Sequence, residues 1–366
     1  MIKTIFPSKD ATLYELTSSL NTGIDEILEI TKIVSSSTGP LHRSRALIQF
    51  DTSTVSASLS TRGITTQSSA GNLKYYLKLF VAEEVDVPLD YDISIHAVSQ
   101  SWDMGIGRKY HKPQTLDGVS WKFRDGETVG THWTGSGTTA SGSSYFSGSH
   151  PQHLTTDIAS QSFSNTSGDI EVDVTSIVEK WHDSKIPNNG FLIRRSGSQE
   201  TSVTEYGSVN YFSRETNTIF PPRLEARFDT PARTVGNMIA VTASSDITVQ
   251  AFVQPEYRRD SEARIEIFVE SRYPARSDAN TTAKPYPYYL PVGATYSVID
   301  HATDEVIIPH DKSGSSIEVA HKNYIDIDMN SLFPERYYFI QVKVPDLLYT
   351  GSEQYFDTDQ YFRVIK

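Results

Sequence analysis

The sequence contains no cysteine in its 366 residues. Disulfide bonds and thiolate metal sites are therefore excluded, and the composition suits a chain made in a reducing cytoplasm. Long apolar runs are missing as well. Neither the N-terminal segment MIKTIFPSKDATLYE nor any later segment has the apolar length of a signal peptide or a transmembrane helix. We therefore expect a protein that has no membrane partner.

The sequence also lacks clusters of positive charge. Its 33 lysines and arginines are outnumbered by 45 aspartates and glutamates, so the formal net charge is −12. Contacts with nucleic-acid phosphates need grouped lysines and arginines. We therefore expect no nucleic-acid partner, and solubility explains the acidic surface.

The short motifs of common enzymes are absent. There is no G-x-S-x-G elbow, no phosphate loop, no H-E-x-x-H and no cysteine nucleophile. His150 and His153 are three residues apart, but the proline between them prevents a helical face and no third metal ligand is implied. Asp326 and Asp328 form a carboxylate pair on an outward strand face, where solvation explains them. The sequence therefore predicts a non-enzymatic protein without a transition-metal site.

Residues that favour strands are abundant. The 20 tyrosines and 16 phenylalanines accompany many Val, Ile and Thr residues. The clearest strand runs from Leu73 to Val81, where apolar side chains alternate with lysines, and Ile93 to Val98 is its expected neighbour. One short helix is expected after Thr175, which would cap it. The length suits two domains with separate cores, so we expect an all-β protein of two domains.

The stretch from Tyr211 to Phe228 joins two expected strands through a charged turn, Ser213-Arg214-Glu215. Pro221 and Pro222 forbid a helix and favour an extended entry to the second strand. In that strand, residues 223–228, apolar and charged side chains alternate, which predicts one buried face.

The same turn carries a family resemblance, together with motifs that precede it in the expected order: Asp10-Ala11-Thr12, Asn21-Thr22-Gly23, residues 45–51 (RALIQFD) and Asp173-Val174-Thr175. Residues 1–229 resemble a DNRLRE-type domain, a jelly-roll module classed with carbohydrate-binding modules. The resemblance implies an N-terminal jelly-roll β-sandwich. It also implies that Asp10 and Asp51 are candidates for a structural calcium site, since Ca²⁺ takes carboxylate and carbonyl oxygens.

Residues 99–168 are longer than such a module needs and are rich in glycine and serine. Insertions of this kind are normally functional or mobile, so we expect this region to be the contact surface of the domain. Trp102 is expected in the core. The side chains of Trp121, Trp133, Tyr110 and Tyr145 are the candidates for contact with a glycan or a protein partner.

The resemblance ends at a linker, residues 230–240. Residues 241–366 contain about seven short alternating segments, which predicts a smaller, immunoglobulin-like β-sandwich. Leu332, Pro334 and Tyr338 have the spacing L-x-P-x-x-x-Y, which resembles a fibronectin-type tyrosine corner. In that arrangement the tyrosine hydroxyl binds upstream backbone and fixes the turn.

Function is predicted from these features together. Jelly rolls of the carbohydrate-binding type usually belong to secreted or surface proteins, yet this sequence has no signal peptide and no disulfides. A tailed-phage virion protein is consistent with both, because virions assemble in the cytoplasm and leave by lysis. We therefore expect a structural virion protein at the neck, tail or baseplate periphery, present in several copies and bound to other virion proteins. The alternative is a carbohydrate-binding adhesin or fibre module; a cytoplasmic protein, or one secreted by another route, is also open.

Overall fold

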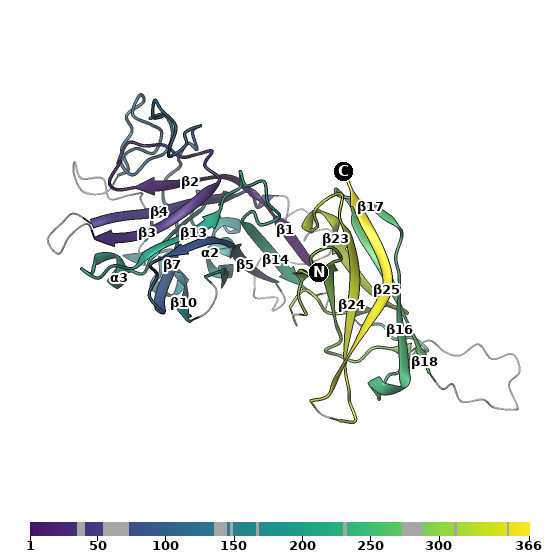
Figure 1. The fold of residues 1–366 in the computed structure, drawn as a ribbon. Coiled ribbons are helices and arrows are strands. Elements are labelled where there is room, and N and C mark those ends of the chain that lie inside the picture. Colours follow the sequence, from purple (N-terminus) through teal and green to yellow (C-terminus); the bar gives the residue numbers. More distant parts are fainter. Residues whose placement is uncertain are drawn as a thin grey trace, which may run out of the picture. The chain divides into compact units, whose positions relative to one another are not determined.

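The computed structural model describes residues 1–34, 41–53, 73–134, 145–146, 149–165, 168–229, 233–272, 288–310, 313–349 and 351–366. Strands make up 49% of the protein and helices 7%, which confirms the predicted all-β class and sandwich architecture. The chain divides into two compact units, each of which is drawn in Figure 1. The N-terminal unit consists of Ile5–Ser69 and Tyr75–Glu225, and the C-terminal unit of Met1–Thr4, Ala70–Lys74 and Ala226–Lys366.

The N-terminal unit is built on an eight-stranded sheet with the order β10-β7-β12-β4-β3-β13-β6, in which β2 also pairs with β4. Its strands are β2 (Pro7–Tyr14), β3 (Ile27–Val34), β4 (Leu41–Phe50), β6 (Val81–Val85), β7 (Asp90–Ala97), β10 (Ala159–Ser164), β12 (Phe191–Arg195) and β13 (Gly207–Phe212). A four-stranded sheet has the order β1-β14-β5-β11, from β1 (Ile2–Ile5), β14 (Arg223–Phe228), β5 (Leu73–Leu79) and β11 (Ile170–Asp173). The minor elements are β8 (Ser149–His150), β9 (His153–Leu154), η2 (Thr155–Asp157), α2 (Thr175–His182) and α3 (Gly197–Thr201).

Two details of the predicted strands are wrong. The segment around Ile93 to Val98 forms β7, which pairs with β10 and β12 rather than with β5. In β14 all six residues are buried, not one face alone. Its charged residues are buried because they have partners: the Arg223 guanidinium lies 5.0 Å from the Phe80 ring, and Glu225 lies 3.6 Å from the Lys78 ammonium.

The predicted helix is present as α2, but Thr175 does not cap it. The N-cap residue is Val174. The Thr175 hydroxyl instead accepts a hydrogen bond of 2.9 Å from the Tyr75 backbone N–H, which ties the start of the helix to β5. Ile177 and Val178 are fully buried, as the helical pattern predicts.

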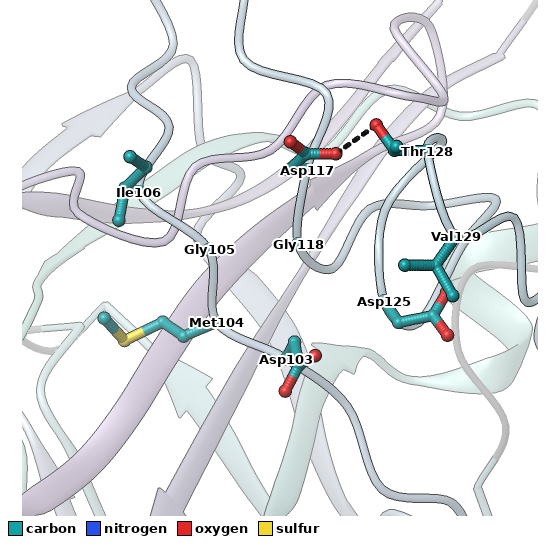
Figure 2. Close-up of a pocket in the computed structure, with 9 residues that line it drawn as sticks. All are labelled: Asp103, Met104, Gly105, Ile106, Asp117, Gly118, Asp125, Thr128 and Val129. Carbon is teal, nitrogen blue, oxygen red and sulfur yellow. Dashed lines mark hydrogen bonds between the residues drawn. The ribbon is translucent and has the colours of Figure 1, made fainter.

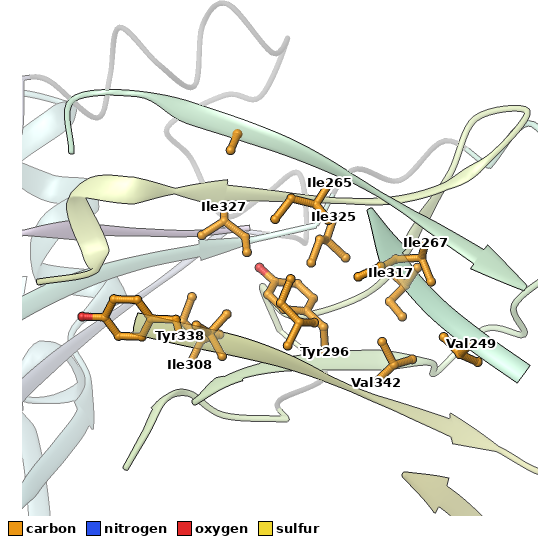
Figure 3. Packing of buried hydrophobic residues seen from close by; sticks show 14 of the residues in the cluster. Val249, Ile265, Ile267, Tyr296, Ile308, Ile317, Ile325, Ile327, Tyr338 and Val342 are labelled. Atoms are coloured by element: carbon orange, nitrogen blue, oxygen red, sulfur yellow. The ribbon is translucent and has the colours of Figure 1, made fainter. Parts of the chain in front are cut away.

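The C-terminal unit is a sandwich of two sheets. One sheet has the order β16-β18-β23-β22, from β16 (Ile247–Phe252), β18 (Glu262–Ser271), β23 (Asn323–Asp328) and β22 (Glu318–Val319). The other has the order β17-β25-β24-β20-β21, from β17 (Glu256–Arg258), β25 (Glu353–Ile365), β24 (Tyr337–Pro345), β20 (Thr295–Asp300) and β21 (Val306–Ile308). The remaining elements are β15 (Ile239–Ala240), β19 (Tyr288–Tyr289), η3 (Ser244–Asp246) and η4 (Met329–Ser331). Figure 3 shows the core between the sheets, where Ile265 and Ile325 face Tyr296 and Val342.

The predicted tyrosine corner is present in this unit. Tyr338 is fully buried, and its hydroxyl donates to the Phe333 carbonyl oxygen over 3.0 Å and accepts from the Phe333 N–H over 2.9 Å. The two hydrogen bonds satisfy both backbone groups of Phe333 and fix the turn before β24.

The carboxylate pair on β23 does not face solvent as predicted. Asp326 and Asp328 are only 5% and 4% exposed. Asp326 is buried because it accepts two hydrogen bonds of 2.9 Å from the Arg264 guanidinium on β18. Burial raises the pKa of the Asp328 carboxyl, which has no such partner from β18.

Candidate functional site

The inserted region covers one face of the eight-stranded sheet. Ala11, Leu47 and Leu192 stand side by side on β2, β4 and β12 and form the floor of a buried cluster. The cluster is completed by Leu13 and by residues of the following segment: Val98, Trp102, Val119, Trp121 and Trp133. The part of the insertion from Trp102 to Trp133 is therefore a packed layer on the sheet, which we call the inserted layer, whereas β10 near the end of the insertion is a strand of the sheet itself. The indole rings of the inserted layer are buried because they replace water on the apolar sheet face.

The structure corrects the prediction that Trp121 and Trp133 offer exposed rings. Each is only 4% exposed. The Trp133 Nε1–H donates to the Ser120 carbonyl oxygen over 3.0 Å, and the Arg45 guanidinium lies 4.9 Å from the Trp121 ring. Trp102 is 3% exposed, as predicted, and its Nε1–H donates to the Asn189 carbonyl oxygen.

The two tyrosines of the predicted contact set have different environments. Tyr110 is 82% exposed. Tyr145 is half-buried, with its ring 4.9 Å from the Arg194 guanidinium and 4.8 Å from the His96 ring. The four predicted residues therefore do not form one exposed platform. Most of residues 134–149, a stretch of the insertion rich in glycine, serine and threonine, lie outside the described residues.

Asn21 holds the inserted layer in place. Its side chain is fully buried, and its Nδ2 donates to the carbonyl oxygens of Met104 over 2.7 Å and Val119 over 2.9 Å. Its Oδ1 accepts from the backbone N–H groups of Gly107 over 2.7 Å and Gly23 over 3.3 Å. One amide thus satisfies backbone groups of loops that are distant in sequence.

Glycine is required where these loops cross. A Cβ atom on Gly23 would lie 2.1 Å from the Met104 carbonyl oxygen. Gly118 has a φ of +98°, and a Cβ there would lie 2.5 Å from the Gly105 Cα and 2.6 Å from the Asn21 Nδ2. The N-x-G motif, Asn21-Thr22-Gly23, therefore has a structural explanation. The Asn21 side chain binds the loops, and the missing side chain at Gly23 lets their backbones approach closely.

A pocket of about 440 Å³ opens in this layer, and Figure 2 shows its lining. Three carboxylates, those of Asp103, Asp117 and Asp125, line it together with apolar Ile106 and Val129. The remaining lining residues are Met104, Gly105, Gly118 and Thr128.

The carboxylates in the pocket are partly held by their neighbours. Asp117 accepts a hydrogen bond from the Thr128 hydroxyl (Figure 2), and Asp125 accepts one of 2.9 Å from the Thr131 backbone N–H. The side chains of Ile106 and Val129 are 73% and 70% exposed. The arrangement can accept a positively charged or hydrogen-bond-donating group between two exposed apolar side chains.

The structure does not support the calcium site that the resemblance implies at Asp10 and Asp51. Asp10 is 1% exposed, and its carboxylate accepts a hydrogen bond of 2.7 Å from the Arg214 backbone N–H. Asp51 is exposed and accepts from the Ser53 N–H over 3.0 Å, which lowers the pKa of its carboxyl. Both carboxylates accept hydrogen bonds from N–H groups, and Asp10 lies close to the positive charge of Arg214. Neither environment suits a bound cation. Within the described residues, no group of three or more His, Cys, Asp or Glu side chains could hold a metal ion.

The contact between Asp10 and Arg214 joins two motifs of the resemblance, the opening Asp-Ala-Thr and the closing Ser-Arg-Glu. The Arg214 guanidinium also donates to the Ser8 carbonyl oxygen, and the Ser213 hydroxyl donates to the backbone carbonyl oxygen of Asp25. Burial raises the pKa of the Asp10 carboxyl to about 7, more than the hydrogen bond from Arg214 lowers it. These motif residues therefore bind one another within the fold rather than form an exposed site.

A buried ionic network lies on the same sheet face as the tryptophans. Glu200 of α3 accepts two hydrogen bonds, of 2.7 and 2.9 Å, from the Arg45 guanidinium and a further one from Arg194. His96 lies beside Arg194, and burial together with that positive charge lowers the pKa of its imidazole to about 4. The sequence shows Arg45 in its RALIQFD motif but gives no sign of its partner, which is 155 residues away.

Comparison of the chain with protein-family models gives no match, and no curated protein matches it either. The resemblance to the DNRLRE-type domain therefore stays a prediction. Within the described part of the chain, no helix has the length and apolar character needed to cross a membrane.

Proposed function

We propose that this chain is a non-enzymatic structural protein of a tailed-phage virion, at the neck, tail or baseplate periphery. It binds a neighbouring virion protein through the inserted layer. The observation that carries the proposal is the construction of that layer: buried indoles and Asn21 hold it on the sheet, while Ile106 and Val129 stay exposed around an acidic pocket.

Such a layer suits a protein contact because it is already ordered before binding. Loop residues that must become ordered on binding reduce the affinity, typically by about 0.5–1.5 kcal/mol for each immobilised side chain. Here the hydrogen bonds of Asn21 and the close crossing at Gly118 hold the backbone beneath the pocket.

The charge of the pocket defines the partner's surface. Asp103, Asp117 and Asp125 favour a lysine or arginine side chain, and Ile106 and Val129 favour apolar residues beside it. A partner with one basic residue flanked by apolar side chains is therefore expected. Several copies of this chain would bind equivalent sites in a symmetric tail.

The proposal is tested by supplying variants in trans to phage that lacks this gene product and analysing the purified particles. Val129→Asp places a charge where the partner's apolar side chains would pack, and this charge would lose its water on binding, so we expect at least a tenfold loss of the chain from particles. Val203→Asp is the matched control, because Val203 is 87% exposed in the same unit but is not part of the pocket. Absence of the wild-type chain from particles, or normal incorporation of Val129→Asp, would refute the proposal.

The alternative function, glycan recognition by an adhesin or fibre module, cannot use the platform first expected for it. Trp121 and Trp133 are buried in the layer, so their rings do not stack on a sugar. Glycan binding would need aromatic side chains elsewhere in the chain.

A further inference from the structure

The outer face of the five-stranded sheet in the C-terminal unit carries a group of exposed aromatic side chains. Along β24, inward residues are buried and alternate with outward ones. Tyr337, Tyr355 and Tyr361 are 52%, 56% and 49% exposed, and Phe339 is half-buried. We call these four residues the aromatic face.

The register of β24 and β25 arranges this face in rows. From one end to the other, the cross-strand pairs are Tyr337 with Arg363, Phe339 with Tyr361, Gln341 with Asp357, and Lys343 with Tyr355. Since successive outward residues are two apart, the four rows extend over about 20 Å. Aromatic rows therefore lie on both sides of one polar row.

The polar row is held in a fixed orientation. Gln341 Nε2 donates to Asp357 Oδ1 over 2.8 Å, and Gln341 Oε1 lies 3.1 Å from His310 Nε2. Because the amide oxygen can only accept, His310 carries its proton on Nε2, and its Nδ1 accepts from the Thr295 hydroxyl 3.2 Å away. The His310 ring also packs against Tyr355, with ring centres 5.5 Å apart.

The charged side chains on this face have local partners. The Lys343 ammonium lies 3.3 Å from the Glu353 carboxylate, and the Arg363 guanidinium is paired with Glu335. The Asp357 carboxylate is bound by the Gln341 amide. A strongly charged ligand would have to compete with these partners, whereas a neutral one would not.

We infer that the aromatic face binds a neutral oligosaccharide. Exposed rings provide apolar surfaces on which the C–H faces of sugar rings stack, and they present large contact area at little entropic cost. Gln341 and Asp357 supply an oriented donor and acceptors for sugar hydroxyls between the stacked rings. The length of the face suits a short chain of sugars rather than a single one. The contact proposed for the inserted layer lies in the other unit, so neither proposal rests on the other.

The test is isothermal titration of the full chain with maltotetraose, cellotetraose and laminaritetraose, each at up to millimolar concentration. We expect binding of at least one of them, weakened at least tenfold by Tyr361→Ala and by Tyr355→Ala. Phe252→Ala is the matched control, because Phe252 is an aromatic residue that is 65% exposed on β16, in the opposite sheet. It should bind as the wild type does.

The outcomes separate clearly because the substituted tyrosines are exposed and circular dichroism can verify folding. Binding lost in the tyrosine variants but kept in Phe252→Ala supports the inference. Binding that survives both tyrosine substitutions, or no binding of any of the three sugars, overturns it. Release of the chain from purified particles by Tyr361→Ala, without sugar binding, would assign the face to a protein partner instead.

Discussion

Asp10 is almost completely buried, and its carboxylate accepts a hydrogen bond from the Arg214 backbone N–H. Its carboxyl pKa of about 7 means that the folded protein holds a proton where the unfolded chain, with an ordinary value of 3.8, has released it. The free energy of unfolding therefore falls as the pH rises from about 4 to about 7. His96 acts in the opposite direction. Its folded pKa of about 4 lies below the ordinary 6.5, so its contribution to stability falls as the pH drops from about 6.5 to about 4.

Asp10→Asn is expected to remove the fall in the free energy of unfolding that Asp10 causes between about pH 4 and about pH 7. The amide oxygen can still accept from the Arg214 N–H, and the side chain stays neutral at every pH. The variant should match the wild type near pH 4 and exceed it at pH 7.5, by at most about 4 kcal/mol in the free energy of unfolding. Urea unfolding at both pH values measures the difference. A difference that does not change with pH would show that Asp10 is ionised throughout the range.

The inserted layer is the element in which side chains distant in sequence decide the structure. Asn21 lies in the loop after β2, and its partners Met104 and Val119 lie 83 and 98 residues further along the chain. The layer has little regular secondary structure of its own, and its order depends on these contacts and on the buried indoles. The geometry of the pocket therefore depends on a residue that does not line it.

Asn21→Asp should loosen this layer. A carboxylate cannot donate to the carbonyl oxygens of Met104 and Val119, and leaving them buried without a donor costs about 1–3 kcal/mol each. Hydrogen exchange in residues 103–119 should accelerate at least tenfold, with a fall in the free energy of unfolding. Asn165→Asp is the control, because Asn165 is exposed in the same unit. Unchanged protection of residues 103–119 would contradict this role of Asn21.

At the scale of the whole molecule, the two units carry different spectroscopic reporters. Trp102, Trp121, Trp133 and Trp181 all lie in the N-terminal unit, so tryptophan fluorescence follows that unit alone. The C-terminal unit contains the tyrosine corner at Tyr338. Fluorescence and far-UV circular dichroism can therefore assign a loss of stability to one unit.

Tyr338→Phe is expected to destabilise the C-terminal unit by about 1–2 kcal/mol, because the Phe333 backbone groups lose a buried partner. The circular dichroism transition should move to lower urea concentration while the fluorescence transition stays in place. Tyr337→Phe, at an exposed neighbour, should change neither. Equal shifts of both signals in Tyr338→Phe would indicate that the chain unfolds as one cooperative system.

Much of the fold could be predicted where a local pattern matches a local structure. Alternation from Leu73 onward predicted the strand that the structure contains as β5, and the spacing of Leu332, Pro334 and Tyr338 predicted a hydrogen bond that the structure contains. The neighbour of the segment 73–81 was predicted wrongly, because strand pairing is decided by contacts between residues distant in sequence. The exposure of Trp121 and Trp133 was predicted wrongly because nothing in a loop sequence shows which surface the loop covers.

The sequence by itself determined the all-β class, the buried strands and the backbone positions that need glycine or proline, because these follow from side-chain periodicity and local sterics. Only the tertiary structure decided which polar residues are buried and with which partners. Arg45 with Glu200 and Asp10 with Arg214 lie 155 and 204 residues apart. Folding brings such pairs together, and their energy depends on the surrounding burial, which no local pattern specifies. The same holds for the candidate surfaces: the acidic pocket and the aromatic face exist only where loops cross and strands pair.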